Sequence, residues 1–178
     1  NAKGGAAIIM DVNTGEILAM ASAPTFDPND RPVPLVSKDA EPSDSPLFNR
    51  AVQGVYELGS TFKIFAVAQA MELGLVNPDT MVDANAPMIW GKHRIKEFEG
   101  HNYGPLLAVR DVIAKSSNVG TAHIALMIGG LRQQAFLKSM GFFEPTPLEM
   151  VEARSSRPLI PPKWPDIVTI TASYGHGM

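Results

Sequence analysis

The chain has 178 residues, enough for one domain with a sizeable core, and 45% of them are apolar while 19% are charged. Its net charge of −3 at pH 7 argues against a nucleic-acid-binding protein, which would normally carry a basic face. The sequence contains no cysteine, which excludes disulfides and thiolate metal sites, and no apolar run long enough to span a bilayer.

The first ordered element expected along the chain is a β-hairpin. Two β-prone runs, Gly5–Met10 and Glu16–Ala21, flank the turn-like residues 11–15. Because both runs are almost continuously apolar, we expect the hairpin to lie in the middle of a covered sheet. The chain enters this hairpin almost at once, as a piece cut from a longer protein would. Residues 24–46 are rich in Pro, Asp and Ser, which predicts a long, mobile surface connection.

A buried helix is predicted to begin at Ser60 and to end just before Gly74. Serine is favoured at helix starts and glycine just past helix ends. The segment is apolar nearly all the way round, which is typical of a buried helix. Lys63 is its only cation and lies in the first turn, where the positive end of the helix dipole disfavours a cation. This unfavourable placement makes Lys63 a candidate functional residue.

The second half of the chain predicts a compact helical subdomain. Short β-prone pieces lie within residues 80–98, and a proline-rich extended stretch covers residues 158–165. Helical segments are expected at Val109–Lys115, Val119–Ile128 and Leu131–Met140. Their short connections favour packing of neighbouring helices against one another.

Ser60 and Lys63 form a Ser-x-x-Lys pair with the chemistry of a nucleophile and its base. Residues three apart on a helix share a face, so the lysine amine can reach the serine hydroxyl. Serine needs a base to remove its proton, and a lysine with an unperturbed pKa would lose about 4.6 kcal/mol in becoming neutral at pH 7. Burial and a helix N-terminus both lower a lysine pKa, so this position suits a general base. The alternative is a capping serine followed by a lysine that extends its amine to solvent.

Ser116 and Asn118 form a second candidate pair between two predicted helices. The serine could relay a proton, and the asparagine amide could bind the lysine or a substrate carbonyl. Helix capping is the alternative role for both residues. Glu97 and Glu99 are expected on the solvated surface. The four histidines lie apart from carboxylates at metal-binding spacing, so we expect no metal and no cofactor.

The two pairs together resemble the first two signatures of the penicillin-recognising serine enzymes, Ser-x-x-Lys and Ser-x-Asn. The flanking sequence Phe48–Lys63 is similar to the nucleophile region of class B penicillin-binding proteins. The opening hairpin with residues 26–29, and Ser173–Gly177 near the end, also resemble that family's transpeptidase domain. The resemblance covers residues 1–178 as the N-terminal part of this domain. The segments Tyr56–Gly59 and Tyr174–Gly177 are more similar to the septal type, penicillin-binding protein 3, than to the elongation type.

This resemblance implies an α/β fold of the β-lactamase/transpeptidase type. It consists of an antiparallel sheet flanked by helices beside a mostly helical subdomain, and is incomplete here. It also implies peptidoglycan D,D-transpeptidation in septal cell-wall synthesis. Lys63 would deprotonate Ser60, Ser116 would pass a proton to the leaving D-Ala, and Asn118 would orient Lys63 and the substrate amide. The implied partners are peptidoglycan stem peptides, β-lactams and divisome proteins, at the periplasmic face of the cytoplasmic membrane.

One departure from the family pattern is the third signature, Lys-Thr-Gly or Lys-Ser-Gly, which these 178 residues do not contain. That strand would supply the second oxyanion donor, and losing one donor typically costs about 10²–10³ in rate. We therefore expect this chain alone to be weakly active or inactive, with the missing part following it or lying on another chain. Two alternatives remain open: a serine β-lactamase, with Glu144, Glu149 or Glu152 as deacylating base, and a non-catalytic β-lactam-binding sensor.

Overall fold

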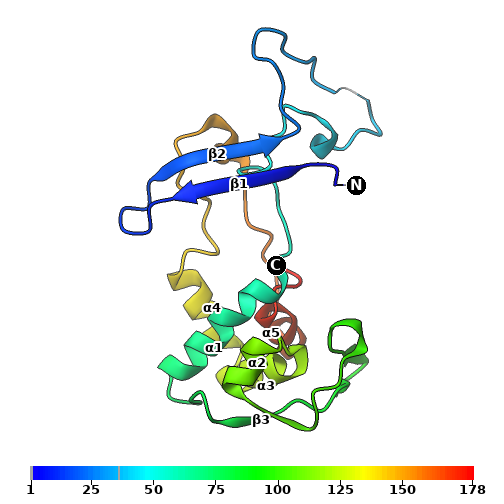
Figure 1. Ribbon diagram of the computed structural model, residues 1–178, viewed down its shortest axis with the longest axis vertical. Helices are drawn as coiled ribbons and strands as arrows, with labels where there is room; N and C mark the ends of the chain where they lie inside the picture. The colour runs from blue at the N-terminus through cyan, green and yellow to red at the C-terminus, as the bar shows by residue number, and fades with distance from the viewer. Residues whose placement is uncertain (1, 36) are drawn as a thin grey trace. The chain divides into compact units, whose positions relative to one another are not determined.

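The computed structural model describes residues 2–35 and 37–178, and its chain forms two compact units (Figure 1). Unit 1 contains the chain up to Val55 together with Pro145–Arg157. Unit 2 contains Tyr56–Glu144 together with Pro158–Met178. Ser60, Lys63, Ser116 and Asn118 all belong to unit 2, whereas Glu149 and Glu152, two of the three bases considered for the β-lactamase alternative, belong to unit 1.

Unit 1 is built around one β-hairpin. Strand β1 (Gly5–Met10) pairs antiparallel with β2 (Ile17–Ala23), with a bulge where Ile9 is followed by Met10. All six β1 residues are solvent-exposed, so the expectation of a covered hairpin is wrong for unit 1. The physical reason is that strand side chains point to the faces of a sheet and are buried only by a layer packed on a face, and the described part of unit 1 places no such layer over β1. Two short 3-10 helices complete the unit, η1 (Pro42–Asp44) and η4 (Val151–Ser155).

The connection predicted for residues 24–46 contains one short element, η1, in its described part. Asp27 accepts the backbone N–H of Asn29 through its carboxylate, and Ser37 accepts that of Asp39 through its hydroxyl, as loop residues commonly do. Val36 also falls in this range and lies outside the described residues. The predicted mobility of the connection stays a prediction.

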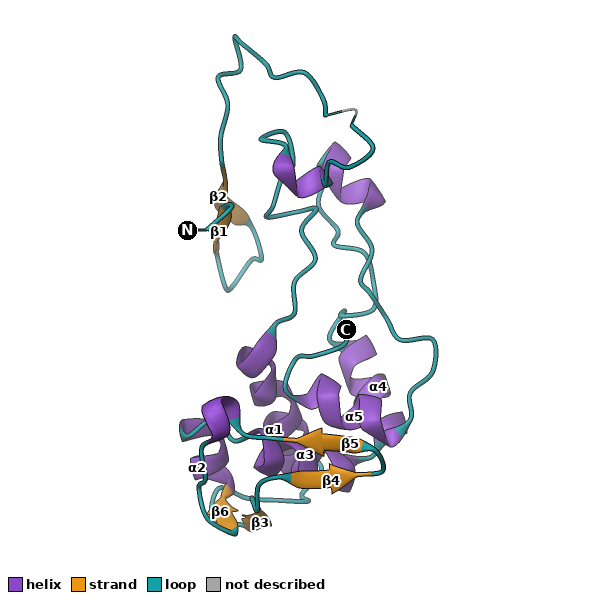
Figure 2. Cartoon of the chain, turned by 90° about the vertical axis from the view of Figure 1, so that its right-hand side faces the viewer, coloured by secondary structure: helices purple, strands orange, loops and turns teal. Residues whose placement is uncertain are grey.

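The regular secondary structure of unit 2 is mostly helical. Its helices are η2 (Gly59–Phe62), α1 (Lys63–Glu72), η3 (Phe98–Gly100), α2 (Val109–Ala114), α3 (Asn118–Ile128), α4 (Gly130–Ser139) and α5 (Asp166–Ser173). Two small antiparallel pairs lie beside the helices, β3 (Met81–Asp83) with β6 (Leu106–Ala108) and β4 (Met88–Trp90) with β5 (His93–Ile95) (Figure 2). The predicted compact helical subdomain is confirmed.

Helix α3 is mainly apolar and lies at the centre of unit 2, with seven of its eleven residues buried. Ile124 and Ile128 are fully buried in a cluster with side chains of α1, α2, β3 and β6. Val119 and Ala122 are fully buried in a second cluster, with side chains of β4, β5 and α5. A Cβ added at Gly120 would lie 2.7 Å from the Val112 side chain, so α2 approaches α3 closely. This packing fixes the start of α3, where Ser117 and Asn118 lie.

The sequence-based helix predictions are confirmed for α2, α3 and α4 within one residue at most ends. The predicted helix from Ser60 to Leu73 is divided in the structure, since η2 precedes α1 and places Ser60 in a 3-10 turn. Helix α5 was not expected from the sequence. No helix in the described part of the chain combines the length and apolar character needed to cross a bilayer.

Candidate active site

Ser60 is presented at the surface by the turn that precedes α1. It is exposed, and it follows Gly59, whose φ of 58° lies in the left-handed region that glycine adopts without strain. The Thr61 hydroxyl donates to the Leu58 carbonyl at 2.7 Å, and the Lys63 backbone N–H donates to the Ser60 carbonyl. These bonds form a tight 3-10 turn, in which residues three apart are eclipsed. Ser60 and Lys63 therefore lie on the same side of the helix start.

The glycine-rich end of the chain lies directly against the Ser60 turn. The Gly59 N–H donates to the Gly175 carbonyl at 3.1 Å. A Cβ added at Gly175 would lie 2.3 Å from the Gly59 carbonyl oxygen, which leaves no room for a side chain at that position. Next to this contact, His176 Nδ1 lies 3.2 Å from Glu57 Oε2. The structure thus brings residues 57–60 and 175–177 together, although they are more than a hundred residues apart in sequence.

Lys63 is the largest of the fully buried side chains of the described core, with 1% of its surface exposed. Its amine does not extend to solvent but donates to the carbonyl of Ser116 at 2.5 Å and to Ser116 Oγ at 2.9 Å. Burial lowers the pKa of Lys63 from 10.5 to about 8, while the negative charge of Glu97 acts to raise it. The expected lowering of this pKa is confirmed, with burial as its main cause.

Ser116 directs both of its oxygens at the Lys63 amine because of its backbone conformation. Its φ is 58°, and outside glycine this left-handed region is uncommon and costs about 1–3 kcal/mol. The residue follows the C-terminal end of α2 and precedes Ser117, which caps α3. The packed helices on either side hold the strained residue in place. Ser116 is thus the residue that contacts the Lys63 amine, whereas the sequence pattern had suggested this contact for the Asn118 amide and a proton-relay role for Ser116.

Asn118 is the first residue of α3 and is half-buried. Its side-chain Nδ2 donates to the Lys96 carbonyl at 2.9 Å, which leaves its Oδ1 without a partner among the described residues. The structure shows no hydrogen bond from Asn118 to Lys63 within those residues, so the orientation of Lys63 by Asn118 stays a prediction. The unpaired Oδ1 could accept a hydrogen bond from a substrate amide.

Glu97 was expected at the solvated surface, and that expectation is wrong. Its side chain is 4% exposed and accepts hydrogen bonds from Ser117 Oγ at 2.6 Å and from the Asn118 backbone N–H at 2.6 Å. The carboxylate therefore lies at the start of α3, beside the Ser116 turn. No local pattern signals this, because Glu97 follows a short strand and meets α3 some twenty residues later. By contrast, Glu99 is exposed as expected.

The resulting arrangement supplies a base at neutral pH. With a pKa of about 8, roughly a tenth of Lys63 is neutral at pH 7, compared with about one molecule in 3,000 at a pKa of 10.5. A neutral amine can accept a proton from a nearby hydroxyl, and both Ser60 and Ser116 carry one. The site can therefore activate a serine without a metal ion. No group of three or more metal-ligating side chains lies together in the described residues.

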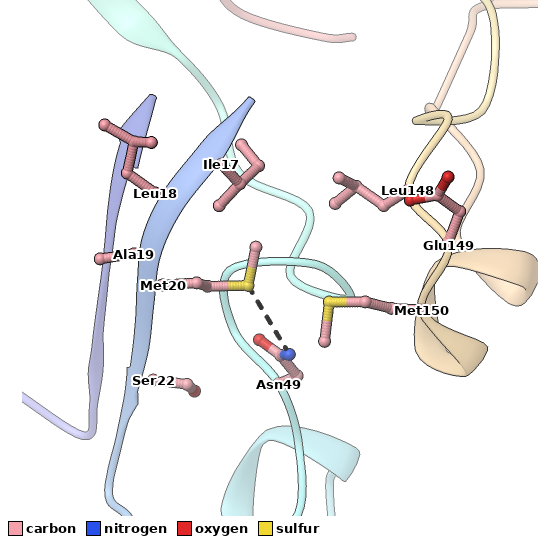
Figure 3. Close-up of a pocket in the computed structure, with 9 residues that line it drawn as sticks. All are labelled: Ile17, Leu18, Ala19, Met20, Ser22, Asn49, Leu148, Glu149 and Met150. Atoms are coloured by element: carbon pink, nitrogen blue, oxygen red, sulfur yellow. Dashed lines mark hydrogen bonds between the residues drawn. The ribbon is translucent and has the colours of Figure 1, made fainter. Parts of the chain in front are cut away.

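A separate groove of about 590 Å³ lies in unit 1, away from these residues in sequence. Figure 3 shows Met20 and Ile17 of β2 facing Leu148 and Met150, with Asn49 donating to the Met20 sulfur at 3.9 Å. Its lining is mainly apolar and lacks a serine–lysine pair.

Known proteins that are similar to this chain belong to the family that its sequence motifs resemble. A family model described as "Penicillin binding protein transpeptidase domain" matches residues 5–178. The probable peptidoglycan D,D-transpeptidase FtsI of Caulobacter vibrioides is 37% identical over 176 residues, which cover 99% of this chain and 28% of that protein. The peptidoglycan D,D-transpeptidase FtsI of Escherichia coli K12 is 34% identical over 179 residues, with the same two coverages.

A solved structure supports the fold assignment. The apo TP domain of penicillin-binding protein 3 from Burkholderia pseudomallei matches with a TM-score of 0.75 and 29% identity, covering 99% of this chain and 46% of that one. The predicted α/β penicillin-recognising fold with an incomplete sheet is confirmed. The chain spans just over a quarter of the length of the curated relatives it matches.

Proposed function

Because the chain belongs to the penicillin-binding protein transpeptidase domain family, we propose that it carries the nucleophile of a peptidoglycan D,D-transpeptidase, with Ser60 acylated during turnover. The single observation that supports this most strongly is the buried Lys63 amine. It has a lowered pKa, it is held by Ser116, and it lies one 3-10 turn after an exposed serine.

The proposed reaction begins when neutral Lys63 takes the proton of Ser60 Oγ, which attacks the carbonyl carbon between the two terminal D-Ala residues of a stem peptide. The C–N bond of the tetrahedral intermediate then breaks. The leaving D-Ala nitrogen receives the proton from Lys63 through Ser116 Oγ, which lies 2.9 Å from the lysine amine. An amine of a neighbouring stem peptide then attacks the carbonyl carbon of the acyl-enzyme, the ester bond to Ser60 Oγ breaks as the cross-link forms, and the proton lost by the amine restores the Ser60 hydroxyl.

Asn118 has the role of holding the substrate in this proposal. Its Nδ2 is fixed by the Lys96 carbonyl, so its Oδ1 is oriented before substrate arrives. A β-lactam that resembles the D-Ala-D-Ala end would acylate the same Ser60. The names of the two FtsI relatives support peptidoglycan transpeptidation. We further propose a septal role, with stem peptides, β-lactams and divisome proteins as partners. We also propose that the protein acts at the periplasmic face of the cytoplasmic membrane, where stem peptides are cross-linked.

The experiment is intact-mass analysis of the full-length protein after incubation with a fluorescent penicillin. We expect one adduct per molecule that persists for hours and is absent in Ser60→Ala. Thr61→Ala is the matched control, because it removes the neighbouring hydroxyl, which bonds to the Leu58 carbonyl and not to Lys63. The 178-residue chain alone should react about 10²–10³ times more slowly, since the third signature is absent from it.

The same measurement separates the two alternative functions. An adduct released within seconds would indicate a serine β-lactamase and contradict the transpeptidase. A stable adduct together with normal cell division in a Ser60→Ala strain would indicate a non-catalytic sensor. No adduct on the full-length wild-type protein would remove the basis for all three readings.

A further inference from the structure

Glu97 is the one buried carboxylate among the described residues, and the reaction proposed above does not use it. It follows β5, two residues after Ile95, and its side chain enters the interior instead of pointing to water. Burying an ionised carboxylate is costly unless hydrogen bonds compensate. The position of Glu97 therefore needs an explanation from its contacts.

The carboxylate is bonded through both oxygens to the first turn of α3. Oε1 accepts from Ser117 Oγ at 2.6 Å and from the Val119 N–H at 3.3 Å. Oε2 accepts from the Asn118 N–H at 2.6 Å. Two of the three donors are amides that a helix start leaves without partners, and the helix dipole favours a negative charge there. Glu97 thus fixes the residues that directly follow Ser116.

Ser117 links this carboxylate to the rest of the helix. Its Oγ donates to Glu97 and accepts the Gly120 N–H at 2.9 Å, and its side chain is fully buried. Ser116, the preceding residue, is in the left-handed conformation that aims its two oxygens at Lys63. Releasing the start of α3 would allow Ser116 to relax from this strained conformation. The bonds to Lys63 would then lengthen.

We propose that Glu97 is a positioning residue of the acylation reaction, which holds Ser116 against the Lys63 amine and places a fixed negative charge near that amine. The inference rests on the proposed function, since it concerns the same serine and lysine. It adds a residue that acts through Ser116 and Lys63 and touches neither substrate nor Ser60.

The electrostatic part of the proposal concerns Lys63. The charge of Glu97 raises the pKa of Lys63 against the larger lowering by burial. Removing that charge lowers the pKa further and extends the neutral form to lower pH. Other charged or titratable groups lie on or next to the elements that pack against α1, namely Glu57, Arg110, Asp111, Lys115, His123, Arg132, Lys138, Asp166, Tyr174 and His176. Among the described groups, Glu97 is the one whose charge shifts the pKa of Lys63.

The test is the pH dependence of the second-order rate constant for acylation by a fluorescent penicillin, measured from pH 5 to 9.5 on the full-length protein. In wild type the rate constant should rise with pH to a plateau at high pH. The limb, meaning the midpoint of this rise, should lie near pH 8, because it is set by the pKa of Lys63. In Glu97→Gln the limb should move to lower pH by at least about half a unit. The high-pH plateau should fall roughly tenfold, because an amide cannot accept from all three donors and Ser116 loses its alignment.

Two further variants separate charge from geometry. Glu97→Asp keeps the charge but shortens the side chain, so the plateau should fall while the limb stays within about 0.2 units of wild type. Glu99→Gln is the matched control, since it makes the same change two residues away on an exposed side chain, and it should leave limb and plateau unchanged. A residue that only capped α3 would change the melting temperature without moving the limb.

Each outcome decides one question. A wild-type protein that forms no adduct overturns the proposed function and not the geometry of Glu97. A wild type that reacts, beside a Glu97→Gln protein with the same limb and plateau, overturns the positioning role. If Glu97→Gln does not fold, as judged by circular dichroism, Glu97→Asp decides, because an undiminished plateau in that variant also overturns the role.

Discussion

Strand β1 and helix α3 are both rich in alanine and isoleucine, yet they bury these side chains very differently. In β1, Ile8 and Ile9 are 45% and 61% exposed, whereas Ile124 and Ile128 of α3 are fully buried. A two-stranded hairpin has no second layer to pack on and is marginally stable in water. Helix α3 is surrounded by four helices and the small strands of unit 2. Apolar composition predicts burial only where the same unit supplies the covering surface.

The comparison matters for chemistry because all four candidate residues lie in the unit that covers its own core. Lys63 needs a dry environment to lose its proton near neutral pH, and unit 2 supplies that environment from residues 56–144 and 158–178. Unit 1 offers exposed apolar strands and a shallow groove. Three predictions test how far the two units differ.

The largest expected effect comes from removing core volume. Ile124→Ala should lower the free energy of unfolding of unit 2 by about 3–5 kcal/mol, because the side chain is fully buried and leaves a cavity. The matched change in unit 1, Ile9→Ala, should cost under about 1 kcal/mol, since that side chain is 61% exposed. Amide hydrogen exchange, resolved by peptide, measures both units in one chain. Equal losses of protection would contradict the comparison.

The second-largest expected effect is a change in the stability of unit 2 at alkaline pH. The folded pKa of Lys63, about 8, is lower than its unfolded value of 10.5, so the unfolded state binds more protons between these values and stability rises with pH. The free energy of unfolding of unit 2 should rise by about 2–3 kcal/mol from pH 8 to pH 10. Above pH 10 the raised pKa of buried Tyr174 acts in the opposite direction.

Urea unfolding followed by tryptophan fluorescence measures this rise, because Trp90 and Trp164 both belong to unit 2. Lys63→Met should abolish it. Unit 1 should respond at the acid end instead, since backbone hydrogen bonds from Asn13 and Thr14 lower the pKa of Asp11. The stabilisation from Asp11 is present above the unfolded pKa and is lost as pH falls through the lower, folded value. A slope in Lys63→Met equal to that of wild type would rule out Lys63 as the source of the rise.

The smallest effect compares two hydroxyl–glutamate pairs. Ser117→Ala should cost about 1–2 kcal/mol in thermal unfolding, because it removes the α3 cap and a donor to buried Glu97. Thr14→Ala removes the same kind of bond, to Glu16 at 3.0 Å, but at the surface of unit 1, and should change stability by less than about 0.5 kcal/mol. A comparable cost in both variants would mean that burial does not set the strength of these bonds.

The sequence was informative wherever the structure depends on neighbours along the chain. The hairpin turn at residues 11–15, and the helices α2, α3 and α4, follow from local turn residues and periodicity. The pairing of β3 with β6 could not be predicted, because each is three residues long and they meet across a long connection. Helix α5 (Asp166–Ser173) was missed because it is only eight residues long and directly follows a proline-rich stretch that was read as extended.

In the candidate site, too, features set by neighbours along the chain could be predicted, and features set by contacts between distant residues could not. Ser60 and Lys63 were found because residues three apart on a helix share a face. Ser116 was found from its place between two predicted helices and from a family pattern. That Ser116 bonds to the Lys63 amine depends on a left-handed backbone and on the packing of α2, which no sequence period encodes. Glu97 was misjudged for a related reason, as its burial results from tertiary contacts with the start of α3. The catalytic roles of all four residues remain predictions.

The contact between Gly59 and Gly175 limits how this protein can vary. A methyl group at position 175 would overlap the main chain beside the nucleophile, and its φ of 79° disfavours other residues as well. His176 next to it is exposed and free of that restriction. Mutational tolerance should therefore change abruptly between these two adjacent positions: the surroundings of the Ser60 turn can vary through the side chain at 176, which contacts Glu57, but not through the glycine before it.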